Sequence, residues 1–241
     1  MIGLGTIVNT AAIVLAGVFG KLFGGALKAR FQDTLIKACG VSVIFIAIAG
    51  VMSKMLSVDG TALSSGRSVL LVLCVAVGAL IGEAINIEDA FERFGEWLKR
   101  KTGNAKDASF VDAFVTASLT VSIGAMAVVG AIRDGLSGDS SVLITKAILD
   151  FVIILVMTSS MGKGCAFSAI PVLLLQGGVT LLASVVAPVM TAAAVQYLSL
   201  IGSVLIFCVG VNLVWGKKIR VANMLPALIL AVAAAYLPWS F

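Results

Sequence analysis

Residues 122–178 read SIGAMAVVGAIRDGLSGDSSVLITKAILDFVIILVMTSSMGKGCAFSAIPVLLLQGG, and they combine two features that seldom occur together. The stretch is apolar enough to lie in a membrane, yet it carries charged residues that include Arg133, Asp134, Lys146 and Asp150. Glycines and a proline interrupt its apolar runs. Lipid cannot solvate a free N–H, a C=O or a carboxylate, so these groups must face protein or a wet cavity. This stretch therefore predicts the centre of a small transporter-like membrane protein.

The whole chain has the composition of an all-α polytopic membrane protein. Of its 241 residues, 60% are hydrophobic and 12% are charged, whereas a soluble domain is about one quarter charged. The apolar runs are close to the roughly 20 residues that cross a bilayer, and they lack the alternation of a β-barrel. The first run lacks the basic start of a signal peptide, so we keep it as a span. We expect a single domain, residues 1–241, with about eight transmembrane helices at 4–26, 36–56, 66–86, 110–132, 140–160, 164–186, 193–214 and 223–240.

Residues 86–101, NIEDAFERFGEWLKRK, are too short and too charged to span a bilayer. Acidic residues fall in the expected first turn and basic residues in the last, with Asn86 as the expected N-cap. One face is apolar, formed by Ile87, Phe91, Phe94 and Leu98. We therefore expect an amphipathic helix that lies on the membrane surface.

The distribution of basic residues predicts the orientation, because cytoplasmic loops are rich in Lys and Arg. If the loop between the first two spans is cytoplasmic, thirteen of the 17 Lys and Arg fall on that side, and only Lys54, Arg67, Arg133 and Lys146 do not. With eight spans, both termini are then expected outside the cytoplasm. The net charge of +5 is explained in the same way and does not indicate a nucleic-acid partner.

The chain also contains a weak internal repeat. A shift of 160 residues places Gly17 on Gly177 and Gly50-Val51 on Gly210-Val211 without a gap. Five spans precede the second copy, so it enters the membrane in the opposite sense. We expect a 3+2+3 inverted repeat, with a first repeat at 1–86, the surface helix and a loop at 86–107, two central spans at 108–161 and a second repeat at 162–241. Inverted repeats with broken helices are typical of transporters whose site lies near the middle of the membrane.

Several blocks of the chain resemble a known family: GTIVNTAAIVLAGVFG (5–20), IGEAINIEDAFERFGEWL (81–98), IGAMAVVGAIRDGLSGD (123–139), KAILD (146–150), MGKGCAFSAIPVLLLQGG (161–178) and ANMLPAL (222–228). They are similar to the YqgA/YdfK-like family of bacterial inner-membrane proteins. The resemblance covers nearly the whole chain, and GAMAVVGAIRDG and FSAIPVLLLQGG are its most specific parts. It implies a multi-pass protein of the bacterial plasma membrane and carries no established reaction, substrate or cofactor. The positions that match the family pattern are Asn9, Glu83, Asp134, Asp150, Ser168, Pro171 and Gln176.

Asp150 is the first candidate for a binding residue, because it lies about ten residues into its span. A charge at that depth costs at least ~2.5–3.5 kcal/mol and should face the bundle. One interpretation is a proton, cation or substrate-amine site. The other is a structural pair, since Lys146 lies four residues earlier on the same helix face. Lys146 could also reach the outer interface.

Further candidates are the uncharged polar residues Asn9, Ser168 and Gln176, which would bind a solute or form hydrogen bonds between helices. Gly124, Pro171 and Gly177 are candidates for helix breaks or gating positions. The MGKGC stretch before the sixth span would receive an anion or form a tight turn. The hydroxyl side chains of the fourth span are more often packing groups than pore lining, and Arg133–Asp134 is expected as a neighbouring pair at a span end.

The residue inventory argues against catalysis and against a metal or cofactor. The chain has no histidine, which removes Ser–His and Cys–His dyads and most imidazole metal sites. Its four cysteines are scattered and form no CxxC motif. A serine nucleophile would need Lys146 as its base, and no GxSG motif is present. We therefore expect no enzyme activity, no metal site and no cofactor.

Two functional hypotheses remain. The first is a secondary transporter or channel for a small solute or ion, with its site formed by Asp150, Lys146, Asn9, Ser168 and Gln176 between spans 1, 4, 5 and 6. The second is a non-transporting scaffold or interaction protein of the cell envelope. The expected partners are the lipid bilayer, an unknown small solute or ion, and a second copy of the chain, since the small residues Ala16, Gly20 and Gly24 recur every four positions.

Overall fold

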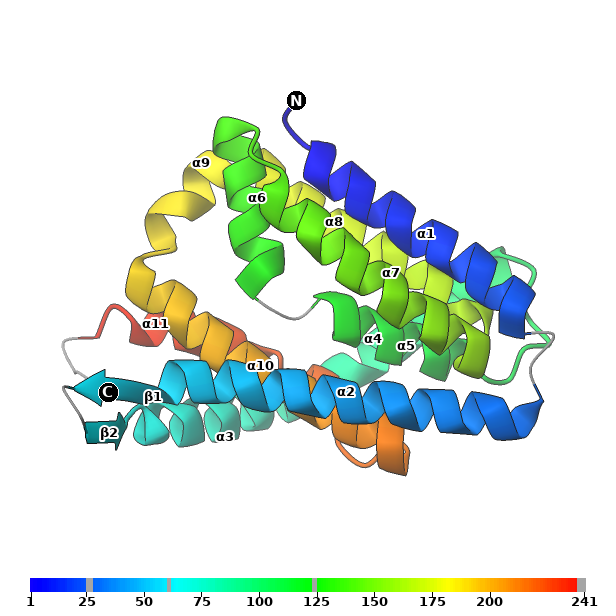
Figure 1. The fold of residues 1–241 in the computed structure, drawn as a ribbon, viewed down its shortest axis with the longest axis horizontal. Helices are drawn as coiled ribbons and strands as arrows, with labels where there is room; N and C mark the ends of the chain where they lie inside the picture. Colours follow the sequence, from blue (N-terminus) through cyan, green and yellow to red (C-terminus); the bar gives the residue numbers. More distant parts are fainter. Residues whose placement is uncertain (25–27, 60–61, 123–124, 238–241) are drawn as a thin grey trace.

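The computed structural model of the chain describes residues 1–24, 28–59, 62–122 and 125–237, and almost all of them are helical (Figure 1). The all-α class predicted above is therefore confirmed. The helices are α1 (Leu4–Gly24), α2 (Ala29–Met55), α3 (Ser68–Ile85), α4 (Ile87–Lys101), α5 (Phe110–Ser122), α6 (Ala125–Ser137), α7 (Ser141–Met161), α8 (Ala169–Leu181), α9 (Ala183–Val186), α10 (Ala192–Trp215) and α11 (Pro226–Ala234). Three short 3₁₀-helices precede or follow them: η1 (Lys163–Ser168), η2 (Ala187–Val189) and η3 (Val221–Met224).

Among the described residues, six helices are long and apolar enough to cross a membrane: α1, α2, α3, α7, η1 with α8, and α10. The predicted fourth span, 110–132, is not one straight helix, because α5 and α6 meet at 61°. Counted together they make a seventh span. In the described part of the last apolar stretch, which ends at residue 237, the helix covers Val221–Ala234, about 21 Å at 1.5 Å per residue. The predicted count of eight is thus not confirmed.

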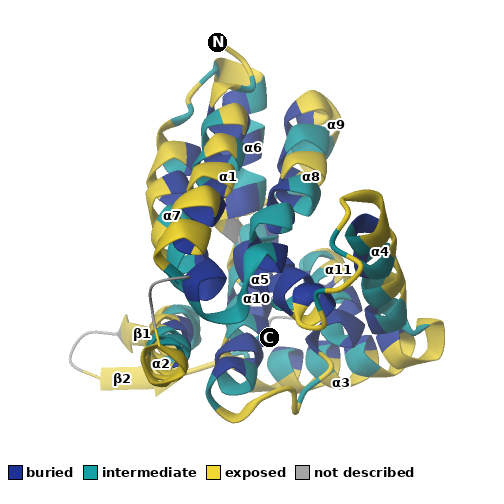
Figure 2. Ribbon diagram, turned by 90° about the vertical axis from the view of Figure 1, so that its right-hand side faces the viewer, coloured by how far each residue is buried: buried dark blue, intermediate teal, exposed yellow. Residues whose placement is uncertain are grey.

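Two local features join the long helices. A hairpin that the sequence analysis did not predict connects α2 to α3, with β1 (Leu56–Asp59) antiparallel to β2 (Ala62–Ser65). The predicted amphipathic helix is confirmed as α4, which lies at the edge of the molecule crosswise to α3 (Figure 2). Asn86 occupies the N-cap position of α4, as expected, but its side chain makes no capping hydrogen bond. It adopts a left-handed conformation between α3 and α4, and its side chain accepts a hydrogen bond from Arg220.

The helices that the proposed repeat relates to one another are packed in antiparallel pairs. α2 contacts α10, with Gly40 beside Gly210 and Gly50 beside Ser203. α3 contacts α11 and η3, with Gly78 beside Ala227. α1 contacts α8 through side-chain hydrogen bonds. Glycine at these positions removes the side chain that would hold the backbones apart, so the helices approach closely.

α1 also packs against α7, which is not its partner in the repeat. The two helices run parallel and are in contact along their whole length (Figure 1). A Cβ at Gly20 would lie 2.7 Å from the Leu155 carbonyl oxygen, and one at Gly24 would lie 2.8 Å from that of Ser159. The small-residue face that suggested a dimer is therefore used within the chain, against α7.

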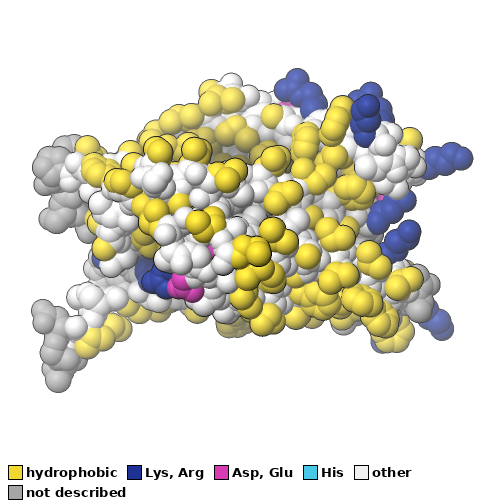
Figure 3. All heavy atoms as spheres, turned by 90° about the horizontal axis from the view of Figure 1, so that it is seen from above, with side chains coloured by type: hydrophobic (Ala, Val, Ile, Leu, Met, Phe, Trp, Pro, Cys, Tyr) yellow, Lys and Arg dark blue, Asp and Glu magenta, His cyan; other side chains and the backbone are white. Residues whose placement is uncertain are grey.

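The core lies around α5, which Figure 2 shows as a largely buried helix in the middle of the molecule. Ten of its 13 residues are buried, including Phe110 and Phe114, so neighbours cover it on nearly every side. The Lys and Arg side chains gather at one end of the molecule, beyond a largely apolar flank (Figure 3). This is the end where α1 finishes and α2 begins. The molecule therefore has one basic end, as the sequence count predicted.

We predict that Gly82→Ala destabilises the protein. A Cβ at Gly82 would overlap the backbone carbonyl oxygen of Asn223. This oxygen belongs to the backbone of η3 and cannot move aside as a flexible side chain would. We expect a loss of about 1–3 kcal/mol, measured as a lower thermal unfolding temperature in detergent. Gly178→Ala is the control, because nothing lies within 4 Å of a Cβ there. Equal unfolding temperatures for the two variants would contradict this packing.

Candidate functional site

The site is centred on an ion pair buried inside α7. Lys146 and Asp150 are four residues apart on one helix face, and Lys146 Nζ lies 2.5 Å from Asp150 Oδ2. Their side chains are only 8% and 5% exposed. The structure therefore favours the direct pairing of the two residues over a Lys146 that reaches the interface.

Lys146 also binds the end of a neighbouring helix. Its Nζ donates a 2.7 Å hydrogen bond to the backbone carbonyl of Val121, in the last turn of α5. Carbonyls in the last turn have no partner within their own helix and carry the negative end of the helix dipole, so an ammonium group stabilises them. The chain bends between α5 and α6 just after this point. The predicted break at Gly124 lies outside the described residues.

The ion pair lies in the wall of a cavity of about 260 Å³ between α2, α5, α6, α7 and α10. Most of the lining is apolar, and the polar lining residues are Thr120, Lys146, Asp150, Ser199 and Ser203. Equivalent positions of α2 and α10 line this cavity. A shift of 160 residues relates Val43 and Ile46 of α2 to Ser203 and Ile206 of α10. The cavity therefore lies beside the pair of helices α2 and α10.

A pair of buried amides links the ion pair to α1 and α8. Asn9 Nδ2 donates a 3.2 Å hydrogen bond to Gln176 Oε1, and both side chains are completely buried. Asn9 also lies close to the Asp150 carboxylate. Within the described part of the chain, Asn9 Oδ1 and Gln176 Nε2 have no partner. Asp150, Asn9 and Gln176 thus form a polar connection across α7, α1 and α8.

The remaining predicted residues have different surroundings. Ser168 is buried where η1 meets α8, and its hydroxyl has no hydrogen-bond partner among the described residues. It does not line the central cavity. Pro171 falls in the first turn of α8, where a missing N–H is tolerated. The prediction of a helix break at Gly177 is wrong, because α8 continues through it to Leu181.

Asp134 has a role that the sequence analysis missed. Its carboxylate is fully buried and accepts hydrogen bonds from the backbone N–H groups of Gly3, at 3.2 Å, and Gly5, at 3.0 Å. A negative charge at a helix start satisfies free N–H groups and the helix dipole. We expected Arg133 and Asp134 to form a neighbouring pair at a span end. Arg133 instead approaches Asp139. Asp134 therefore ties the start of α1 to α6, more than 120 residues away in the sequence.

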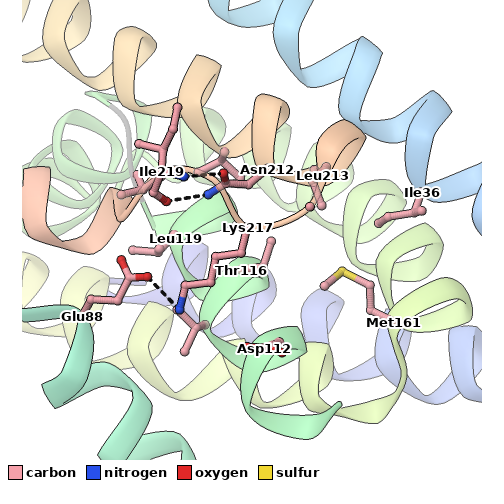
Figure 4. Close-up of a pocket in the computed structure, with 14 residues that line it drawn as sticks. Ile36, Glu88, Asp112, Thr116, Leu119, Met161, Asn212, Leu213, Lys217 and Ile219 are labelled. Carbon is pink, nitrogen blue, oxygen red and sulfur yellow. Dashed lines mark hydrogen bonds and ion pairs between the residues drawn. The ribbon is translucent and has the colours of Figure 1, made fainter.

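A second cavity, of about 280 Å³, opens at the basic end between α4, α5, α10 and the loop after α10 (Figure 4). Figure 4 shows Lys217 pointing toward Glu88, and the two charged groups are 2.9 Å apart. Burial lowers the pKa of Lys217, but its hydrogen bonds to Glu92 and Glu88 outweigh burial and raise the pKa above the ordinary 10.5. Asn212 fixes the loop by hydrogen bonds to the backbone of Ile219.

The polar residues of α5 form two separate stripes. Asp112 and Thr116 line the cavity at the basic end, and Thr120, on the same helix face, lines the central cavity. Ser118 and Ser122 face another cavity on the other side of the helix. Spacings of four residues keep each stripe on one face. The first stripe therefore runs from the basic end toward the buried ion pair.

Comparison with known proteins gives relatives whose names state no activity, one of them named as a membrane protein. A family model described as "Protein of unknown function (DUF554)" matches residues 4–236. The chain is 25% identical over 237 residues to the "Uncharacterized membrane protein YdfK" of Bacillus subtilis (strain 168), covering 98% of this chain and 97% of the relative. It is 28% identical over 242 residues to the "Uncharacterized protein YqgA" of Escherichia coli (strain K12), covering 98% of each. No solved structure matches the chain.

We predict that the two partners of the buried ion pair depend on each other. Asp150→Leu leaves the Lys146 ammonium in an apolar interior without its carboxylate, and we expect a loss of about 3 kcal/mol. The double variant Lys146→Met/Asp150→Leu removes both charges at similar volume, so we expect part of that stability to return, while the Val121 carbonyl still loses its donor. Thermal unfolding in detergent measures both. A double variant as unstable as the single one would contradict a simple pairing.

We also predict an alkaline transition that depends on Lys217. Its pKa is raised in the folded protein, so its contribution to stability is complete below the ordinary value of 10.5 and is lost as the pH rises through the higher folded value. The stability difference between the natural protein and Lys217→Gln should therefore shrink as the pH rises above the ordinary value of 10.5. Lys218→Gln, which alters an exposed neighbour, should show no such change. The two variants are compared by thermal unfolding across this range.

Proposed function

The chain belongs to the DUF554 family, and we propose that it is a secondary transporter or channel for a small solute or ion. The observation that carries this proposal is the Lys146–Asp150 pair in the wall of the central cavity. Ionisable residues inside membrane segments are costly, and where they occur they usually form ion, proton or substrate pathways. A pair that only held helices together could be replaced by apolar residues at little or no cost in stability.

The unpartnered polar atoms of the predicted site residues give a second argument. Asn9 Oδ1, Gln176 Nε2 and Ser168 Oγ are buried, and none has a hydrogen-bond partner in the described part of the chain. Each such atom costs about 1–3 kcal/mol. A site that binds and releases a polar solute or an ion supplies partners to groups of this kind. We therefore assign Asp150 and Lys146 to direct binding, and Asn9, Gln176 and Ser168 to supporting polar contacts.

The arrangement of the helices supports alternating access. The helices related by the 160-residue shift pack in antiparallel pairs, as expected for two copies that cross the membrane in opposite senses. The two central spans are related to the two halves in an equivalent way. α1 of the first half runs beside α7, and η1 with α8 of the second half runs beside α5 and α6. In the proposed 3+2+3 repeat, the two halves exchange conformations and expose the central cavity to each side in turn.

The stripe on α5 suggests the route at the basic end. Asp112, Thr116 and Thr120 lead from the cavity of Figure 4 to the central cavity, with Lys217 and Glu88 at its outer part. We propose that the basic end faces the cytoplasm of a bacterial plasma membrane and that both termini lie outside, in agreement with the bias of Lys and Arg. A proton or cation that neutralises Asp150 would release Lys146 from its carboxylate partner. Because Lys146 also binds the end of α5, a change of charge at the pair would then act on that helix.

The alternative is a scaffold or interaction protein without transport. It rests on association of copies through small-residue faces, but Gly20 and Gly24 of α1 already contact α7. A homodimer therefore remains a proposal that needs another surface. The proposal of transport includes no catalytic step, no metal and no cofactor.

The proposal is tested in two stages. First, thermal stability of the purified protein is measured against a panel of ions and small metabolites. A ligand at one hundred times its dissociation constant stabilises the folded state by about 2.7 kcal/mol. Second, flux of each stabilising ligand is measured in liposomes for the natural protein, Asp150→Asn and Asp139→Asn. Asp139 is the matched control, because it is a carboxylate in the loop between α6 and α7.

We expect Asp150→Asn to abolish both the stabilisation and the flux, and Asp139→Asn to preserve them. If flux persists in Asp150→Asn, the role of Asp150 is wrong. If no ligand stabilises the protein and no flux occurs, transport is wrong and the scaffold hypothesis takes its place. Crosslinking in native membranes would then look for a stable partner.

A further inference from the structure

A third cavity, of about 670 Å³, lies on the other side of α5, between α4, α5, α8 and α11. Its lining is almost entirely apolar, with Phe91 and Phe94 from α4, Leu174 and Leu175 from α8, and Leu228 from α11. No charged residue lines it. The volume lies within the range of about 300–1,000 Å³ that is usual for ligand sites. This cavity differs from the two described above, which both contain ionisable side chains.

Two serine hydroxyls are the exception to the apolar lining. Ser118 is 1% exposed, and Ser118 Oγ and Ser122 Oγ are buried without a hydrogen-bond partner among the described residues. Many other hydroxyls of the helices bond to the carbonyl four residues earlier, as Thr120 does with Thr116 at 2.7 Å. Ser118 and Ser122, one helical turn apart, do not, and both residues line this large apolar cavity. A ligand with an oxygen-bearing group would supply their missing hydrogen bonds.

We propose that this cavity binds a lipid-soluble molecule with a long apolar chain and one uncharged oxygen-bearing group, which is held by Ser118 and Ser122. The apolar walls fit the chain and exclude a hydrophilic solute, because a polar solute would lose its hydration without gaining partners. The lack of charged lining residues excludes a charged headgroup at this position. The proposal does not rest on transport, since these serines lie on the opposite side of α5 from the ion pair.

The ligand enters from the bilayer. Leu174 lines the cavity and is 66% exposed on the apolar flank of the molecule, so the cavity opens toward the acyl chains. The apolar face of α4 forms another wall through Ile87, Phe91 and Phe94. A surface helix in this position covers the cavity toward the headgroups. It leaves the lateral opening at α8 as the route for a molecule that is already dissolved in the membrane.

Trp97 provides a reporter for this site. Its ring stacks on Phe94, which lines the cavity, with the ring centroids 5.8 Å apart and the planes at 14°. A bromine-labelled long-chain alcohol bound in the cavity should quench Trp97 fluorescence by contact. The background variant Trp215→Phe/Trp239→Phe retains Trp97 as the single tryptophan of the chain. The comparison ligand is a bromine-labelled alkane of the same length, which lacks the oxygen.

The binding experiment compares both ligands in liposomes for three proteins with Trp97 alone. These are the background protein, its Ser118→Ala/Ser122→Ala form, and its Ser42→Ala/Ser53→Ala form. Ser42 and Ser53 are exposed serines of α2 whose hydroxyls bond to their own helix, so they control for contact with bulk lipid. Removing two small hydroxyls preserves the packing, so we expect all three proteins to fold.

We expect saturable quenching by the alcohol in the background protein and in the Ser42/Ser53 control. The Ser118/Ser122 variant should bind the alcohol about tenfold more weakly, as the loss of hydrogen bonds to a buried group predicts. In that variant the alcohol and the alkane should bind alike. Quenching that rises without saturation, or that is the same for both ligands and all three proteins, would mean that only bulk lipid reaches the cavity and would overturn the proposal.

Discussion

The hydrogen bonds of Lys146 are the interaction on which the centre of the structure depends. Its ammonium group binds a carboxylate on its own helix and the free carbonyl of Val121 at the end of α5. In water these groups would be solvated separately. In a bilayer, a half-helix that ends inside the bundle needs an internal partner for its carbonyls, and an aspartate at that depth needs a cation. One side chain meets both needs, so the bend of the fourth span and the buried charge of the fifth form one structural unit.

The same constraint explains how the surrounding helices are connected. The carboxylate of Asp134 satisfies the first N–H groups of α1, and Asn9 joins α1 to Gln176 of α8. Glycines bring the paired helices into backbone contact, as Gly82 does with Asn223. With no hydrophobic force between helices in lipid, close packing and hydrogen bonds must hold them together. The polar atoms that remain without partners are consequently informative: among the described residues, those of Asn9 and Gln176 lie beside the central site, and those of Ser118 and Ser122 belong to residues that line the cavity beside α4.

The amphipathic helix α4 and the Lys146–Asp150 pair were predictable from the sequence because both depend on local spacing. Charges and apolar residues recur at helical intervals in the first, and four residues separate the pair in the second. The predicted break at Gly177 was wrong for the opposite reason. Glycine weakens a helix only slightly, so packing decides where a helix ends, and α8 remains continuous through Gly177. The hydroxyls of α5 could not be assigned either, since the cavity that each one faces depends on the neighbouring helices.

The sequence by itself determined the class of the protein, the approximate place of its helices, its basic end and the position of Lys146 and Asp150 on one face of a helix. These properties follow from composition and from contacts within one helix. Only the tertiary structure decided that Gln176 meets Asn9, that Asp134 caps α1, and that Lys146 binds the end of α5. Their partners lie 167, 129 and 25 residues apart in the sequence. Apolar helices of similar length can pack in many ways, and the choice among them depends on the sum of many weak contacts that no short pattern encodes.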